Sequence, residues 1–347
     1  MKTGLQQLDA VPEGLLDAAP ENLQSLLGGP TLLHLPGRRP EPLFVSVLLH
    51  GNETTGFLAL QAVLRDYRDR ELPRALSIFF GNVAAAAAGL RRLEGQPDYN
   101  RVWPGGEGAG TPEHALMAAV VREMEGRHPF AAIDVHNNTG TNPHYACVNR
   151  IDHRYLHLAT LFSRTVVYFT RPRGVAAMAM GNLCPSVTVE CGKPGQPHGT
   201  EHVRAFLDAA LHLSDIPVHP VALHDIDLFH TVLILKVAEE CRFGFGGSDA
   251  GADLDFLPDL DRMNFRELPP GTCLARVRGG RLDCLQAWDE RGRDRVADYF
   301  AVEQGELRTR RAVMPSMFTL DERVVRQDCL GYLMERYELV APDEALP

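Results

Sequence analysis

Two residues that could bind a metal, His50 and Glu53, stand three positions apart where the apolar run 43–50 gives way to a segment with helical spacing. An imidazole nitrogen and a carboxylate oxygen are common ligands of catalytic zinc, and a strand-to-helix turn can aim both at one point. The pair has a simpler explanation too, a histidine packed at a strand end and a glutamate favoured by the dipole of the next helix. A metal site therefore needs further ligands from elsewhere.

A further histidine, His136, ends a second apolar run, residues 130–136. In open α/β sheets ligands collect beyond the carboxyl ends of the strands, so two strands are expected to deliver imidazoles to one edge. Two histidines and a glutamate leave a fourth zinc position open for water. Asp134 lies two residues earlier on the same strand face and could orient His136 through a hydrogen bond; the alternative is a plain buried carboxylate.

An acid at a third strand end, Glu190, closes the apolar run that begins at residue 186. A zinc hydrolase needs a carboxylate that takes a proton from water and returns it to the leaving nitrogen, and we assign this role of general base to Glu190. The alternative is an ion pair with Lys193. Cys191 could be a nucleophile, but its surroundings in the sequence show no paired histidine, which favours a small core residue.

Apolar runs with no polar alternation predict strands that are buried on both faces. They lie at residues 43–50, 75–82, 130–136, 164–170 and 186–191. Segments with helical spacing lie at 54–70, 112–126 and 198–213. This alternation predicts an α/β fold, a mixed and mostly parallel sheet sandwiched by helices.

The chain has 347 residues, more than a single hydrophobic core usually holds. The pattern of its predicted elements changes near residue 218. A Gly-rich connector and short strand-like pieces broken by Gly and Pro follow. We predict a zinc-hydrolase catalytic domain at 1–217 and a smaller, mostly-β C-terminal domain at 218–347.

The net charge of -10 disfavours nucleic acid and anionic membrane surfaces as partners. The sequence shows no signal-peptide pattern and no apolar run approaching eighteen residues. Seven cysteines without paired spacing indicate reduced thiols and a cytoplasmic location. The expected partner is a small anionic substrate, and a homo-oligomer is compatible with these features.

Four segments together resemble the aspartoacylase and succinylglutamate desuccinylase family in order and spacing, and MNFRELPPGTCLARV (263–277) resembles the entry to its second domain. The four are HGNETTG (50–56), GNVAAAAAGLRRLEGQPDYNRVW (81–103), DVHNNTG (134–140) and VTVECGKPGQ (187–196). The family belongs to the zinc carboxypeptidase clan and cleaves the amide of N-acyl amino acids. The resemblance implies a zinc carboxypeptidase-like fold, one Zn²⁺ per chain at His50, Glu53 and His136, and a catalytic carboxylate at Glu190.

The resemblance also assigns substrate-binding residues. It implies that Asn100 and Arg101 hold a substrate carboxylate, a task that suits the planar fork of arginine. It places a carbonyl-polarising arginine near Arg92, with Arg91 as the alternative because the following stretch is one residue longer than in aspartoacylase. For each of these residues the alternative is a solvated surface position.

Two of the family's substrate contacts have no clean match. Residues 174–189 contain no arginine upstream of Glu190, and Arg171 and Arg173 are the nearest substitutes. A tyrosine expected late in the second domain has no counterpart around residues 314–320.

The predicted function is zinc-dependent hydrolysis of the amide bond of an N-acyl amino acid. One alternative is a zinc carboxypeptidase that acts on short peptides, and another is a non-catalytic binding protein on the same scaffold.

Overall fold

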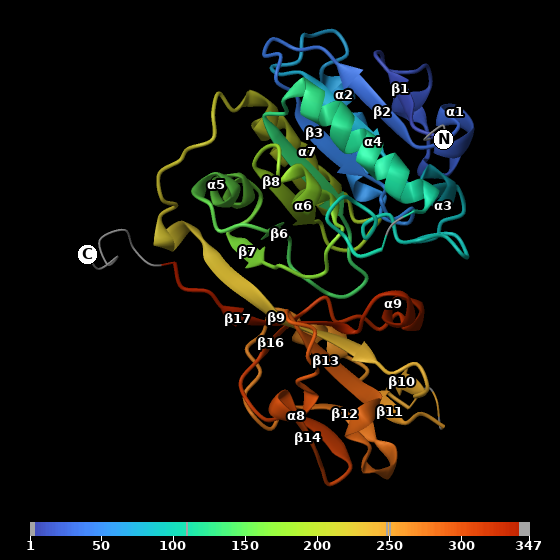
Figure 1. Ribbon diagram of the computed structural model, residues 1–347, viewed down its shortest axis with the longest axis vertical. Coiled ribbons are helices and arrows are strands. Elements are labelled where there is room, and N and C mark those ends of the chain that lie inside the picture. Colours follow the sequence, from blue (N-terminus) through green and yellow to red (C-terminus); the bar gives the residue numbers. More distant parts are fainter. Residues whose placement is uncertain (1–3, 109, 248, 250, 340–347) are drawn as a thin grey trace. The chain divides into compact units, whose positions relative to one another are not determined.

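The computed structural model describes residues 4–108, 110–247, 249 and 251–339, and the chain folds into two compact units (Figure 1). Within the described residues, unit 1 comprises 4–137 and 144–227, and unit 2 comprises 138–143 and 228–339. The domain boundary predicted at 217 and 218 stays a prediction.

Unit 1 contains a mixed sheet whose strands lie in the order β1-β2-β4-β3-β5-β8-β6-β7. Strands β4, β3, β5 and β8 are mutually parallel, whereas β2 and β6 pair antiparallel with β4 and β8. All residues of the four central strands are buried, as expected for strands covered on both faces. The strands are β1 (Gln6–Leu8), β2 (Thr31–Leu35), β3 (Leu43–Val47), β4 (Leu76–Phe80), β5 (Ala131–His136), β6 (Tyr145–Val148), β7 (Thr165–Tyr168) and β8 (Ser186–Glu190).

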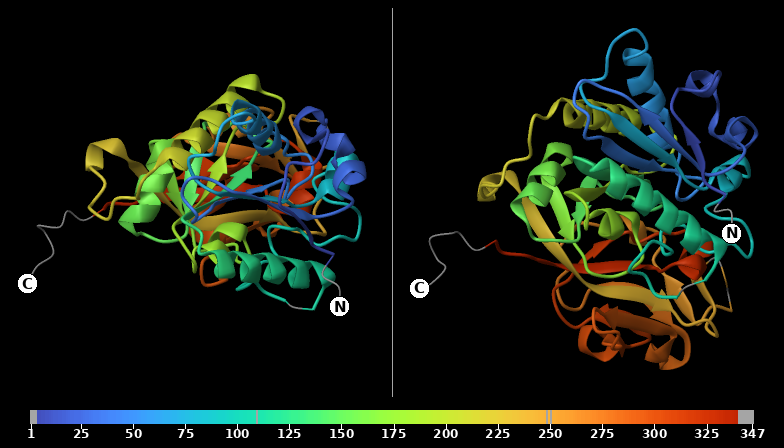
Figure 2. Two further views of the ribbon diagram at one scale, coloured as in Figure 1. Left: turned by 90° about the horizontal axis from the view of Figure 1, so that it is seen from above. Right: turned by 45° about the horizontal axis from the view of Figure 1, so that its top comes forward.

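Helices cover both faces of this sheet (Figures 1 and 2). Helix α2 packs with α7, and α7 with α5, on one face, whereas α4 and α6 share an apolar cluster on the other. The helices are α1 (Leu23–Leu27), α2 (Thr55–Asp66), α3 (Val83–Ala87), α4 (Pro112–Arg127), α5 (His153–Phe162), α6 (Ala176–Met180) and α7 (Pro197–His212), with 3-10 turns η1 (Leu15–Asp17), η2 (Pro20–Asn22) and η3 (Leu223–Asp225). The predicted class, a mostly parallel sheet sandwiched by helices, is confirmed.

Unit 2 is mostly β, as predicted. Strands β16, β17, β9 and β13 pair antiparallel in that order, and a second sheet has the order β10-β11-β12-β15-β14. The strands are β9 (Asp227–Val237), β10 (Phe243–Phe245), β11 (Leu254–Phe256), β12 (Cys273–Val277), β13 (Leu285–Asp289), β14 (Phe300–Glu303), β15 (Glu306–Thr309), β16 (Met314–Ser316) and β17 (Gly331–Arg336). The helical pieces are α8 (Val296–Tyr299), α9 (Glu322–Gln327), η4 (Leu260–Met263), η5 (Arg278–Gly280) and η6 (Leu282–Cys284).

The segment 138–143, which continues the chain after β5, is fixed inside unit 2. The Thr141 hydroxyl donates to Asp261 Oδ2 at 2.7 Å. Gly140 leaves room for a neighbouring carbonyl, because a Cβ atom there would lie 1.9 Å from the Phe318 oxygen.

The cysteine prediction is wrong for one pair. Cys241 and Cys284, 43 residues apart, form a disulfide in unit 2, and Cys147, Cys184 and Cys191 are buried free thiols. Both half-cystines are almost fully buried, and their separation in the sequence is too long to form a recognisable motif. Disulfides are uncommon in cytosolic proteins, so the cysteines no longer support the predicted compartment.

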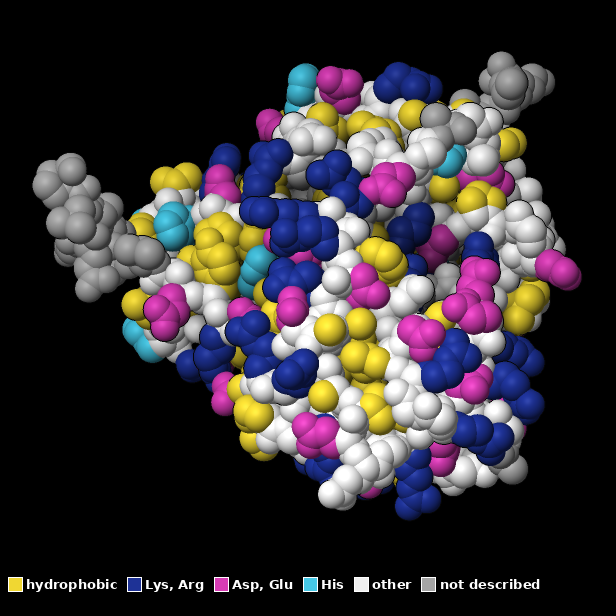
Figure 3. Space-filling view, turned by 60° about the horizontal axis from the view of Figure 1, so that its bottom comes forward, with side chains coloured by type: hydrophobic (Ala, Val, Ile, Leu, Met, Phe, Trp, Pro, Cys, Tyr) yellow, Lys and Arg dark blue, Asp and Glu magenta, His cyan; other side chains and the backbone are white. Residues whose placement is uncertain are grey.

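Within the described residues, no helix is long and apolar enough to cross a membrane. Acidic and basic side chains are interspersed over the face shown in Figure 3.

Candidate active site

The turn between β3 and α2 orients the first two site residues. The Glu53 amide donates to the His50 carbonyl at 3.1 Å, which closes the turn. Gly51 lies directly against the backbone of α3, where a Cβ would come within 2.2 Å of the Ala86 nitrogen. A larger residue at position 51 would push the turn, and His50 with it, away from its neighbours.

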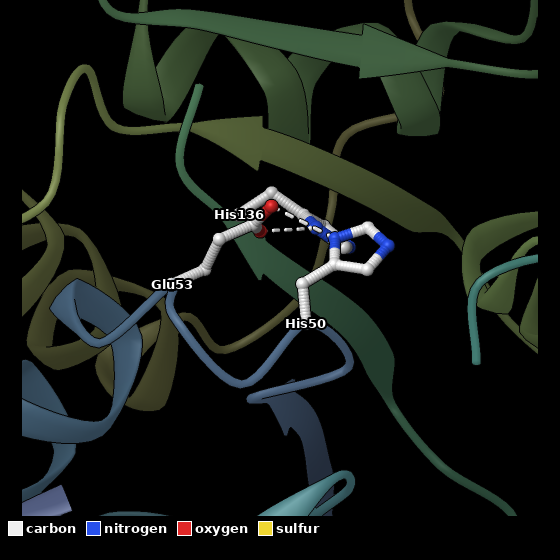
Figure 4. Close-up of side chains that lie close together, drawn as sticks. All are labelled: His50, Glu53 and His136. Atoms are coloured by element: carbon white, nitrogen blue, oxygen red, sulfur yellow. Dashed lines mark hydrogen bonds and ion pairs between the residues drawn. The ribbon is translucent and has the colours of Figure 1, made fainter. Parts of the chain in front are cut away.

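Three side chains converge at the carboxyl ends of β3 and β5 (Figure 4). Glu53 Oε1 lies 2.8 Å from His50 Nδ1, and Glu53 Oε2 lies 2.8 Å from His136 Nδ1. One potential ligand atom from each residue lies within 4.8 Å of the others, and all three residues are buried. The sequence-predicted His-Glu-His set is therefore assembled around one point.

Each histidine has a second carboxylate behind it. Asp98 Oδ1 lies 2.9 Å from His50 Nε2, and Asp134 Oδ2 lies 2.8 Å from His136 Nε2. Asp134 also accepts a hydrogen bond from the Ser46 hydroxyl on β3 at 2.6 Å. With both Nε2 atoms bonded to carboxylates, the Nδ1 atoms face the centre of the cluster, the arrangement by which metal-ligating histidines are usually oriented.

The electrostatics of the cluster favour a cation. Burial lowers the pKa of His136, but Asp134 and Glu53 outweigh it and raise the pKa well above its ordinary value. Burial also raises the pKa of Glu53, yet His50 and His136 bring it far below its usual range. A divalent cation would displace the protons from the two Nδ1 atoms and leave neutral imidazoles. The carboxylates of Glu53, Asp98 and Asp134 and the guanidinium of Arg91 then sum to two negative charges, which the cation would balance. These nitrogen and oxygen donors fit zinc.

Glu190 ends β8 directly beside His136. The two residues are aligned in register on parallel strands, so their side chains project from the same face of the sheet. Glu190 is buried, at 6% exposure. Burial raises the pKa of the Cys191 thiol, and the charges of Glu190 and Glu53 raise it further. With a raised pKa, Cys191 is not an activated nucleophile.

Of the two adjacent arginines, Arg91 faces the cluster. Its Nη1 lies 3.3 Å from Glu53 Oε1 and its Nη2 lies 3.1 Å from Asp98 Oδ2. The Arg91 carbonyl also accepts from the Gly51 amide at 3.0 Å, which ties this residue to the His50 turn. Arg92 instead donates to the Gln96 carbonyl in its own loop at 2.9 Å. The geometry thus favours Arg91 as the arginine that would polarise the carbonyl. The resemblance in sequence had placed this role near Arg92.

Asn100 and Arg101 lie beside the cluster. Asn100 Nδ2 lies 3.1 Å from His136 Nε2, and its Oδ1 accepts from the Ala176 amide at 3.0 Å. The bond to the Ala176 amide therefore holds the Asn100 side chain against the His136 ring. Arg101 donates to the Asn100 carbonyl at 2.8 Å. Burial raises the pKa of Asp98, but the charges of His50 and then Arg101 bring it well below its usual range.

The proposed substitutes for the missing family arginine lie elsewhere. Arg171 pairs with Glu107, and Arg173 is exposed and lines a small cavity with Arg150 and Asn182. Asp98, the partner of His50, was not singled out from the sequence, although it lies in the segment 81–103 that carries the resemblance.

A family model now identifies the chain. The succinylglutamate desuccinylase/aspartoacylase catalytic domain matches residues 42–216, just over half of the 347 residues. The chain belongs to this family. The match contains every residue of the cluster, and the resemblance found from the sequence is confirmed. A comparison with curated protein sequences gives no significant match.

Solved structures of desuccinylases and aminoacylases share the fold of this family member. A succinylglutamate desuccinylase from Chromobacterium violaceum aligns with a TM-score of 0.54 and 16% identity over 87% of both chains. A succinylglutamate desuccinylase/aspartoacylase from Rhodobacter sphaeroides gives 0.57 and 14% over 88% of both. Murine aminoacylase 3 gives 0.53 and 15% over 86% of this chain and 96% of that one. At such identities the comparison establishes the fold.

Proposed function

We propose that this protein is a zinc-dependent hydrolase that cleaves the amide bond of an N-acyl amino acid. The observation that carries the proposal is the convergence of His50 Nδ1, His136 Nδ1 and the Glu53 carboxylate, with Glu190 beside them on the same face of the sheet. Membership of the family supports an enzyme that acts on amide bonds.

His50, Glu53 and His136 would hold one Zn²⁺. Bound there, zinc would lower the pKa of a water molecule and polarise an acyl carbonyl. Asp98 and Asp134 keep the ligating nitrogens directed inward through their bonds to the two Nε2 atoms.

Glu190 supplies the proton transfers in this proposal. Its carboxylate takes a proton from the attacking water and gives it to the departing amine nitrogen, so one residue serves both halves of the hydrolysis. Its position at the end of β8, next to His136, is suitable for both transfers.

Arginines would bind the substrate. Arg91 has five N–H donors, so it can hold Glu53 and Asp98 and still donate to a developing oxyanion. Arg101 would bind a substrate carboxylate through its planar fork. The proposed substrate is therefore a small anion.

The variant Glu190→Gln tests the central assignment. It should keep its zinc, because Glu190 is not one of the three ligands, while kcat falls by at least ~10²-fold. Glu125→Gln, which changes an exposed glutamate on α4, is the matched control and should keep full activity. Unchanged kcat in the Glu190 variant would remove Glu190 from the mechanism.

A substrate panel separates the proposal from its alternatives. N-acetyl and N-succinyl amino acids and short peptides would be compared by release of free amine. Preferential cleavage of peptides would indicate a carboxypeptidase. A zinc-to-chain ratio near zero in the purified protein, together with no cleavage, would indicate a binding protein.

A further inference from the structure

Asn137, the residue directly after His136, contacts the segments that leave three different strands of unit 1. It is buried, at 4% exposure. Its backbone amide donates to Glu53 Oε2 at 3.1 Å, so the main chain beside one proposed zinc ligand holds the carboxylate of another. This contact uses only the backbone, and the side chain of Asn137 makes two further bonds of its own.

The side-chain amide of Asn137 accepts at one end and donates at the other. Its Oδ1 accepts from the amide of Thr55, the first residue of α2, at 3.2 Å. The first amides of a helix have no partner inside the helix, so Asn137 caps α2 from another strand end. Its Nδ2 donates to the Gly192 carbonyl at 2.8 Å. An amide N–H needs an acceptor and a carbonyl needs a donor, so these two partners fix the orientation of the Asn137 amide.

The bond to Gly192 holds the turn that follows Glu190. Gly192 has a φ of +74°, a left-handed conformation that suits glycine, so the chain turns two residues after Glu190. The Cys191 amide donates to the His136 carbonyl at 3.0 Å and extends the pairing of β5 with β8 by one bond. The Asn137 amide adds a further bond between the same two segments, just beyond Glu190.

We propose that Asn137 is a positioning residue that fixes Glu190 relative to the zinc-binding residues. This inference rests on the proposed function, in which Glu53 binds zinc and Glu190 transfers protons. A single planar amide joins the helix that follows Glu53 to the turn that follows Glu190, so the separation of the two turns is set by one rigid group. A misplacement of about 1 Å can cost on the order of 10²-fold in rate, so loss of this link should lower kcat.

Two variants separate the Gly192 bond from the cap on α2. Asn137→Asp keeps an acceptor for the Thr55 amide but places a carboxylate oxygen against the Gly192 carbonyl, whereas Asn137→Ala removes both bonds. Each should lower kcat by ~10–100-fold with KM within ~2-fold of the parent value and zinc still bound, because no zinc ligand or substrate-binding arginine is changed. A loss of kcat in Asn137→Ala alone would assign the effect to the cap, and a loss in Asn137→Asp alone would assign it to charge. Either result would reject the proposal.

A double-mutant cycle tests whether Asn137 acts through Glu190. In a Glu190→Gln background, Asn137→Ala should lower kcat by less than ~3-fold further, since the position of a group that no longer transfers protons has little effect on the rate. A general defect in the fold would lower kcat by the same factor in both backgrounds and would contradict the proposal. Asn149→Asp is the matched control, because the Asn149 amide also donates to a carbonyl in unit 1, that of Phe169 at 3.0 Å, and its kcat should match that of the parent protein.

Amide hydrogen exchange tests the inference without a substrate. The bond from the Cys191 amide to the His136 carbonyl lies in the turn that Asn137 holds, so loss of the side-chain bond should let it open more often. The Cys191 amide should exchange at least ~10-fold faster in both Asn137 variants, as expected for local opening, and the Thr55 amide should do so only in Asn137→Ala. If no N-acyl amino acid is cleaved, the proposed function fails, while exchange still decides whether Asn137 holds the turn. Unchanged exchange at Cys191 in both variants would overturn the inference.

Discussion

Replacing Asp134 by asparagine should weaken zinc binding by about tenfold. Asp134 is 2% exposed and bonds His136 Nε2 through one oxygen and the Ser46 hydroxyl through the other. Asparagine has nearly the same shape. Its oxygen can still accept from His136 while its amide nitrogen donates to Ser46, so the substitution removes the charge and keeps the contacts.

The magnitude follows from the kind of hydrogen bond that is changed. A hydrogen bond to a charged group contributes ~1.5–3 kcal/mol, and one between neutral groups contributes ~0.5–1.5 kcal/mol. The middles of these ranges differ by about 1.3 kcal/mol, close to the ~1.4 kcal/mol that corresponds to a tenfold change in affinity. This lies at the lower end of the ~10–100-fold losses seen when partners of metal-ligating histidines are removed.

Competition with a chromophoric chelator would measure the zinc affinity of the variant. Ser46→Ala is the matched control, because it removes the hydroxyl from Asp134 Oδ1 and leaves the carboxylate on His136. We expect its affinity to change by less than ~3-fold, since a neutral hydrogen bond contributes little net energy. The reasoning fails if Asp134→Asn binds zinc as tightly as the parent protein, or if Ser46→Ala loses as much affinity as Asp134→Asn does.

Three further predictions concern the metal, the arginines and the turn. Removal of metal by a chelator should abolish amide hydrolysis and lower Tm, and one equivalent of zinc should restore both, because a ligand bound only to the native state stabilises it. Arg91→Gln should lower kcat/KM at least ~10-fold and Arg92→Gln by less than ~3-fold, because only Arg91 contacts the cluster; equal losses in a steady-state assay would refute this. Gly51→Ala should destabilise the protein by ~1–3 kcal/mol in urea unfolding, because its Cβ would overlap backbone, whereas Gly126→Ala in α4, with open space around it, should be neutral or stabilising.

The sheet and its metal-binding residues could be predicted from the sequence because both follow from short-range patterns. Unbroken apolar runs predicted β3, β4, β5, β7 and β8, and the edge at which parallel strands end is fixed by their direction. Residues directly after such runs could therefore be placed together without knowledge of any contact.

Residues in irregular segments could not be placed in this way. Asp98 and Arg91 lie in a loop with no periodicity, and their directions depend on tertiary contacts such as the bond from the Gly51 amide to the Arg91 carbonyl. Two adjacent arginines gave no basis for choosing between them. For the same reason the pairing of Cys241 with Cys284 could not be found, since it depends on how distant parts of unit 2 fold together.

The register of β8 has a consequence for how the protein can vary. Side chains alternate between the two faces of a strand, so the direction of Glu190 depends on whether the number of residues from the start of the strand is odd or even. Many apolar substitutions within β8 would preserve that parity. Deleting one residue between Ser186 and Glu190 would turn the acid toward α2 and α7, away from His136, even if the sheet still formed. The protein should therefore tolerate apolar substitutions in β8 far better than the loss or gain of a single residue.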